Sequence, residues 1–132
     1  MDVSQFDVVV CAGSLRSSDA HAVRFAHRWT PEGVTVEAEF TGAHLLHLAA
    51  AGCVLNDLYR EAAALGLRID GVRVTATGGF DADSWVSTGI SYAVDVDSPA
   101  SPGELARLLA VVDEIAEIPR ALRAGAPVSR TS

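Results

Sequence analysis

The sequence contains no lysine, only two cysteines, and no apolar stretch of the about 18 residues that a membrane-spanning helix needs. Its ten basic residues are all arginines, and 17 acidic residues outnumber them, so the net charge is −7. Proteins that bind nucleic-acid backbones or anionic membranes by charge need clustered positive residues. The composition therefore argues against nucleic-acid and membrane partners.

The cysteine count excludes two further classes. Cys11 and Cys53 are too few for a disulfide scaffold or a thiolate zinc site, and no CxxC motif is present. The first ten residues, MDVSQFDVVV, lack the basic segment followed by an apolar segment that is typical of a signal peptide. We therefore expect a cytoplasmic protein.

What is present indicates a folded chain. The 132 residues are 49% hydrophobic and 20% charged, and a chain of this length can bury a substantial core. We find no repeat, low-complexity tract or boundary, so a single domain over residues 1–132 is expected.

Alternating or β-branched segments predict the strands. We expect the second of them to form a hairpin with the first, and a turn at Gly78-Gly79. The predicted strands are residues 6–12, 21–29, 34–40, 69–77, 85–96 and, shorter, 126–128.

Two segments predict helices. The first runs from Gly42 to Leu65, with Thr41 as its N-cap and Gly66 as a left-handed C-cap. The second begins with the capping sequence Ser-Pro-Gly-Glu at residues 101–104 and is interrupted at Pro119, after which residues 120–124 are predicted to form a turn. The order βββ-α-ββ-α has no βαβ alternation, so the fold class is α+β.

The first helix is unusual because it is apolar on all sides. Between Leu45 and Leu55 every residue except His47 is apolar or glycine. A helix of this kind is buried all round. We expect one sheet to be insufficient, so that a second sheet or a second subunit covers the rest.

Cys53 on this helix is the first candidate for chemistry. Helical geometry places Asp57 and Arg60 on its face, and Arg60 could stabilise a thiolate. The alternative is that Cys53 is a small buried apolar residue. His44 and His47 share another face, too far round the helix for Cys53 to join them, so we expect no metal site. His44 should support the first turn, and His47 should be a hydrogen-bonded histidine in the interior or at an interface.

The segment FTGAHLLHLAAAGCVLNDLYREAAALGLRIDGVRV, residues 40–74, resembles the OsmC/Ohr family. The shared pattern is a long buried helix with a cysteine late in an alanine-rich stretch, then a polar half, a glycine cap and a strand. The order of the remaining elements also fits. The resemblance implies two long helices packed with sheets in an intertwined homodimer, and reduction of organic hydroperoxides by two cysteines without a cofactor.

The resemblance assigns roles to single positions. Cys53 matches the cysteine that attacks the peroxide, and Arg16 loosely matches the arginine that supports the thiolate. The resolving cysteine is replaced by Ile118, and the glutamate that orients the arginine by Ala43. Cys11 lies in an early strand, where we expect no disulfide with Cys53, although a substitute resolving role is open.

Two functions follow from this incomplete site. The first is thiol-dependent reduction of hydroperoxides at Cys53 in a one-cysteine form, with an external thiol as reductant. The second is a non-catalytic dimer of the same fold that binds a small apolar ligand at the subunit interface.

Overall fold

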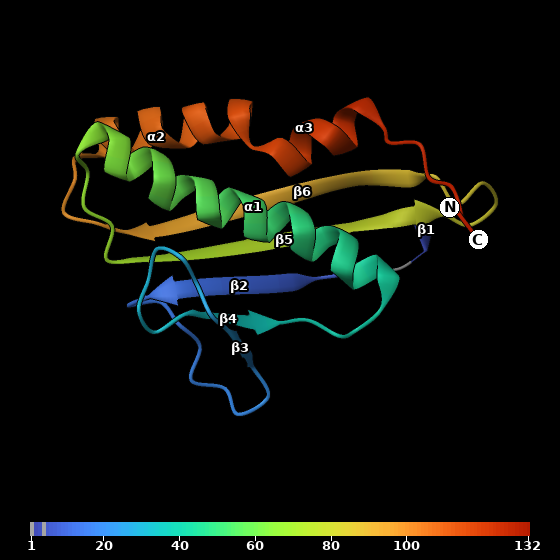
Figure 1. Ribbon diagram of the computed structural model, residues 1–132, viewed down its shortest axis with the longest axis horizontal. Coiled ribbons are helices and arrows are strands. Elements are labelled where there is room, and N and C mark those ends of the chain that lie inside the picture. The colour runs from blue at the N-terminus through green and yellow to red at the C-terminus, as the bar shows by residue number, and fades with distance from the viewer. Residues whose placement is uncertain (1, 4) are drawn as a thin grey trace.

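The fold was analysed in a computed structural model that describes residues 2–3 and 5–132 (Figure 1). One antiparallel sheet carries the helix α1 (Gly42–Leu65) across it, and the helices α2 (Pro102–Ile115) and α3 (Glu117–Ala124) run beside α1. The strands are β1 (Asp2–Val3), β2 (Val8–Gly13), β3 (Val23–Phe25), β4 (Val34–Glu37), β5 (Gly71–Asp81) and β6 (Ser87–Asp97).

The six strands of the sheet have the order β6–β5–β2–β4–β3, and β1 pairs with β5 beyond the end of β2. The expected α+β class is therefore confirmed. The long β5–β6 hairpin pairs Gly71 with Asp97 at one end and Phe80 with Ser87 at the other. In this hairpin, β5 provides the central strand that most of α1 packs on.

The predicted hairpin between the first two long strands is wrong. β3 pairs with β4, not with β2, and β4 pairs with β2 on its other edge. The reason is the turn before β4, in which Gly33 donates to the Thr30 carbonyl at 3.2 Å and has a φ of 78°. This short turn places β3 directly beside β4 in the sheet, whereas residues 14–22 form a longer connection between β2 and β3.

Gly78 and Gly79 do not form the predicted turn, because β5 continues through them to Asp81. A Cβ at Gly78 would lie 2.4 Å from His47 Nε2 and 2.3 Å from the Gly89 carbonyl oxygen. Glycine is required here for close packing of α1 on the sheet rather than for chain reversal.

The C-terminal predictions are also corrected. The segment expected as a turn belongs to α3, and Pro119 lies in its first turn, where a missing N–H costs little. Residues 126–128, expected as a strand, are irregular and exposed, with Val128 95% exposed.

Both ends of α1 are confirmed as predicted. Thr41 Oγ1 accepts from the His44 amide at 3.1 Å, and the Leu67 amide donates to the Ala62 carbonyl at 2.8 Å past Gly66. The capping box of Ser101 and Glu104 on α2 is formed as well.

Helices of the same chain, and not a second sheet, provide part of the cover of α1, and cover by a second subunit stays a prediction. The sheet covers one side of the helix, and α2 and α3 of the same chain cover part of the remainder. The core where these elements meet contains Leu55 and Leu58 of α1, Val72 and Val74 of β5, and Leu108 of α2. No helix in the described part of the chain is long and apolar enough to cross a membrane.

Leu58 tests how much stability this layer contributes. Its side chain is 0% exposed, so Leu58→Ala should lower the free energy of unfolding by about 2–5 kcal/mol through lost transfer energy and a cavity. Leu65→Ala, at a residue 49% exposed on the same helix, should change it by less than about 1 kcal/mol. Urea unfolding of both variants measures the difference, and equal losses would contradict the assigned core.

Candidate functional site

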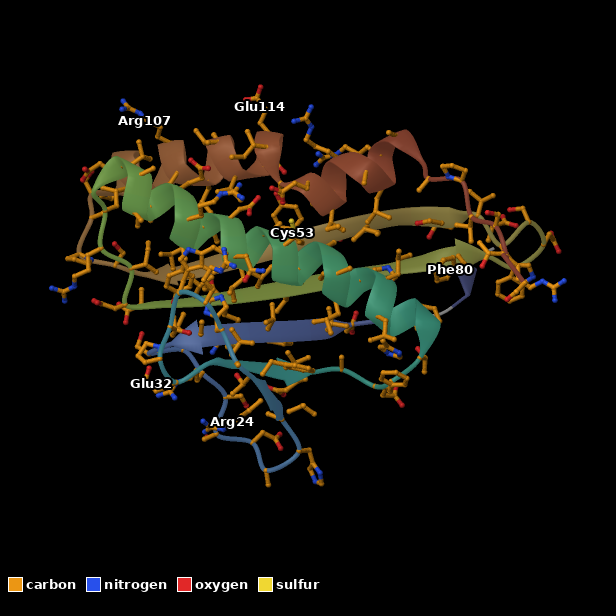
Figure 2. All side chains as sticks on the ribbon, in the orientation of Figure 1. Arg24, Glu32, Cys53, Phe80, Arg107 and Glu114 are labelled. Atoms are coloured by element: carbon orange, nitrogen blue, oxygen red, sulfur yellow. The ribbon has the colours of Figure 1, made fainter. Side chains whose placement is uncertain are left out.

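Cys53 lies midway along α1, on the side that faces the start of α3 (Figure 2). The residue is 8% exposed. Its Sγ lies 3.4 Å from Oε2 of Glu117, the first residue of α3, to which the thiol donates. The break between α2 and α3 thus places a carboxylate directly against the thiol.

Arg60 binds the carboxylates of this site rather than the sulfur. Its Nη1 lies 3.2 Å from Glu117 Oε1 and its Nη2 lies 3.2 Å from Asp57 Oδ1. A weaker contact of 3.4 Å joins its Nε to Glu61. Among the described residues no contact supports the expected stabilisation of a thiolate by Arg60, because its guanidinium binds three carboxylates.

Asp57 is the most enclosed charged group of the site. Its side chain is 3% exposed, and Oδ2 has no hydrogen-bond partner among the described residues. Burial raises the pKa of this carboxyl, while the neighbouring Arg60 opposes the shift. A buried acceptor without a donor is rare in folded proteins and calls for an explanation.

The thiol of Cys53 is held in its protonated form. Burial raises its pKa most, and the carboxylates of Glu117 and Asp57 raise it further, whereas the backbone N–H of Ile118 acts in the opposite direction. Glu117 has a lowered pKa, first because Arg60 binds it and then because Cys53 donates to it. At neutral pH the pair is therefore a neutral thiol beside an ionised carboxylate.

A cavity of about 400 Å³ opens between α1, β6 and α3, and neither Cys53 nor Glu117 lines it. Ala50, one turn before Cys53, and Pro119, two residues after Glu117, both line it. Most of the other lining residues are apolar or aromatic: Leu46, Val86, Ile90, Tyr92 and Leu122. A hollow of about 450 Å³ on the opposite sheet face is lined by Thr75, Thr77 and Ser91 and lies away from the thiol.

Arg16 lies in the turn after β2, and its Nε donates to the Gly13 carbonyl at 3.0 Å. No hydrogen bond or ion pair joins Arg16 to Cys53 in the described part of the chain. Within one chain, the two predicted catalytic residues are therefore not brought into contact, and the pairing stays a prediction. Ala43 offers only its carbonyl, which accepts from His47 Nδ1 at 2.6 Å.

The two helix histidines are structural. The His44 ring lies 2.6 Å from Thr41 Oγ1 through Nδ1 and 3.4 Å from the Glu39 carboxylate through Nε2, which confirms its role at the first turn. His47 is 0% exposed and packs against Phe6. It is interior as expected, but only Nδ1 has a hydrogen-bond partner, while Nε2 has none among the described residues.

Cys11 faces away from α1. Its neighbours Val10 and Ala12 belong to the core beneath α1, and successive side chains of a strand point to opposite faces. Cys11 instead pairs across the strands with Thr35 and Arg73. The sheet thus separates Cys11 from Cys53, which explains why both are free cysteines.

Glu117 is the residue of the candidate site that sequence reasoning missed. It directly precedes Ile118, the position assigned to the resolving cysteine, and it lies 64 residues from Cys53 along the chain. Its position beside a matched site residue was the available signal, but the contact itself depends on how α3 packs against α1.

Comparisons with known proteins agree with the fold. The family model described as OsmC-like protein matches residues 26–130. The crystal structure of an OsmC-like hydroperoxide resistance protein from Jannaschia sp. CCS1 superposes with a TM-score of 0.61 at 11% identity, covering 96% of this chain and 91% of that one. At this identity the likeness concerns the fold alone. A search of curated proteins found no significant match.

The electrostatics of Cys53 give a pH prediction. Because its pKa is raised, the rate of alkylation by iodoacetamide should rise with pH to a midpoint above that of an ordinary cysteine. Glu117→Gln removes a group that favours the protonated thiol, so it should move the midpoint to lower pH. The exposed Glu114→Gln is the matched control, and a midpoint below pH 7 in the unmodified protein would refute the assignment.

Proposed function

We propose that this chain, which belongs to the OsmC-like protein family, reduces organic hydroperoxides slowly at Cys53 and is regenerated by an external thiol. Support comes from the family match and from the hydroperoxide resistance named for the structural relative. The observation that carries the proposal is the 3.4 Å contact of Cys53 Sγ with the Glu117 carboxylate, one turn along α1 from the cavity residue Ala50.

The chemistry needs a base for the thiol and an acid for the leaving alcohol. Glu117 takes the thiol proton while the sulfur attacks the outer oxygen of the hydroperoxide. The O–O bond breaks, the alcohol leaves with that proton, and Cys53 becomes a sulfenic acid. One external thiol then condenses with it and releases water, and a second thiol frees Cys53 as the external disulfide forms.

The same geometry limits the rate. The raised pKa of Cys53 leaves little thiolate at neutral pH, and Arg60 is held by carboxylates. Ile118 supplies no second thiol, so regeneration is a bimolecular step without the high effective concentration of an internal partner. A cytoplasmic location, as the sequence predicts, would provide the reducing thiols that this cycle requires.

The alternative function is binding of a small apolar ligand without turnover. The lining of the 400 Å³ cavity favours it, as does a thiol that burial and two carboxylates keep protonated. In that case Cys53 lies behind the wall, one turn after Ala50 on α1, and does not react.

We also propose that two copies of the chain associate. The edge strand β3 is exposed along its length, with Val23 51% and Phe25 54% exposed, and Phe40 near the start of α1 is 91% exposed. An unpaired strand edge next to exposed apolar side chains is a surface that soluble proteins normally cover.

Peroxide treatment tests the proposed reaction. One equivalent of cumene hydroperoxide should oxidise Cys53 once, with slow recovery upon addition of a small thiol, and mass spectrometry with a sulfenic-acid trap measures both steps. Cys53→Ser should abolish the reaction, whereas Cys11→Ser should leave it unchanged because Cys11 lies on the other face of the sheet.

Glu117→Gln separates the thiolate population from proton transfer. This variant should alkylate at lower pH but react with peroxide on the order of tenfold more slowly, because the leaving alcohol loses its proton donor. Faster peroxide reaction in Glu117→Gln would refute the role of Glu117. No oxidation of Cys53 at excess peroxide would refute the enzyme and leave the ligand-binding function.

Sedimentation velocity tests the association. At micromolar concentration the protein should sediment as a dimer, and Phe25→Glu on the exposed edge strand should shift it toward the monomer. A stable monomer of the unmodified chain across this concentration range would refute the proposed homodimer.

A further inference from the structure

Three potential metal ligands meet at the contact between α1 and α3. One donor atom each of Cys53, Asp57 and Glu117 lies within 4.8 Å of the others. Cys53 and Asp57 are four residues apart on α1 and so project from one face in consecutive turns, a spacing that lets two helix residues bind one ion. From these residues we infer that the protein has a binding site for a borderline-soft divalent cation, with Zn²⁺ as the best match.

Arg60 orients the two carboxylates so that each keeps one oxygen free. It binds Oδ1 of Asp57 and Oε1 of Glu117, both at 3.2 Å. The other oxygens remain: Glu117 Oε2 lies against Cys53 Sγ, and Asp57 Oδ2 is buried without a partner among the described residues. Arg60 therefore has the position of an outer-shell residue that fixes metal ligands, and no ion needs to displace it.

The unpartnered Oδ2 is the independent sign of a ligand. Asp57 is 2% exposed, and water or protein donors would normally satisfy its second oxygen. A cation bound also by the Cys53 sulfur and by Glu117 would satisfy this oxygen. A second hydrogen bond from Arg60 to Asp57 would not involve the thiol.

One ligand-to-ligand distance and the charge of the site fit zinc. Zinc lies about 2.3 Å from sulfur and about 2.1 Å from oxygen in tetrahedral sites, so an adjacent sulfur and oxygen are about 3.6 Å apart. The Cys53 Sγ to Glu117 Oε2 distance is 3.4 Å. With Cys53 as a thiolate, the three ligands and Arg60 sum to a charge of two minus, which one divalent ion neutralises. A water molecule would complete the coordination.

This site differs from those that the sequence excluded. The excluded sites were a zinc site built on several thiolates and a site on His44 and His47, which here contact Thr41 and Ala43. The thiolate–carboxylate site was not visible in the sequence because Glu117 reaches Cys53 only through packing. The inference does not depend on the proposed function, since it requires no peroxide.

Calorimetry on the tag-free, reduced and chelator-treated protein tests the site. Titration with Zn²⁺ should give one ion per chain, and repetition in two buffers of different ionisation enthalpy should show release of the Cys53 proton. Co²⁺ in place of Zn²⁺ should produce a near-ultraviolet thiolate-to-metal charge-transfer band, which identifies the sulfur as a ligand.

Single substitutions assign the ligands. Glu117→Gln and Asp57→Asn should each weaken zinc binding by about tenfold or more, and Cys53→Ser should also remove the cobalt band. Glu114→Gln and Cys11→Ser should leave binding unchanged. Glu117 has a side chain 62% exposed at the start of α3, so Glu117→Gln is a test that does not threaten folding.

The outcomes distinguish the two proposals. Absence of stoichiometric binding, or unchanged binding in both Glu117→Gln and Cys53→Ser, overturns the zinc site and leaves the peroxide reaction of Cys53 untouched. A thiol that binds zinc but does not react with peroxide overturns the proposed function alone.

Discussion

The structure depends on the burial of α1. The helix packs on β5 and β2, and its buried side chains extend from His44 to Ala62. Gly78 illustrates the constraint, since the sheet approaches the helix so closely that a Cβ there would collide with His47. The need to cover this helix accounts for three features: the apolar strand faces beneath it, the glycine in β5, and the position of α2 and α3 beside α1.

Burial also decides the chemistry of the residues that α1 carries. Cys53 and Asp57 lose solvent, and for each of them burial is the largest cause of a raised pKa. Arg60 lies one turn further along α1 and binds Asp57, but it also reaches Glu117 at the start of α3. A single arginine thus links the two helices through their carboxylates, and the thiol is left next to negative rather than positive charge.

Features that depend on neighbouring residues were predictable from the sequence. The caps at Thr41, Gly66 and Ser101 form as expected because each involves residues within a few positions. The extent of α1 was predictable for the same reason. Three features were not predictable, because each depends on what packs against the segment. They are the pairing of β3 with β4, the course of β5 through Gly78 and the helix that continues after Pro119.

The site shows the same division more sharply. Cys53 was identified from its place in α1. Asp57 was identified from helical geometry, which places its carboxylate on the same helix face. Glu117 was not, because no local pattern links residues 64 positions apart. Yet Glu117 decides which charge lies against the thiol, because its carboxylate, and not a positive group, accepts the hydrogen bond of Cys53.

A thiol beside a base has two available reactions, and both begin with loss of the same proton. Transfer of that proton to a leaving alcohol gives sulfenic acid, and its release to solvent leaves a thiolate that a cation can bind. In the proposed reaction peroxide would enter from the apolar cavity lined by Ala50 and Pro119, whereas the cation would lie on the Asp57 side of the sulfur. Because one sulfur lone pair would be committed to the metal, a bound cation would suppress the reaction of Cys53 with peroxide.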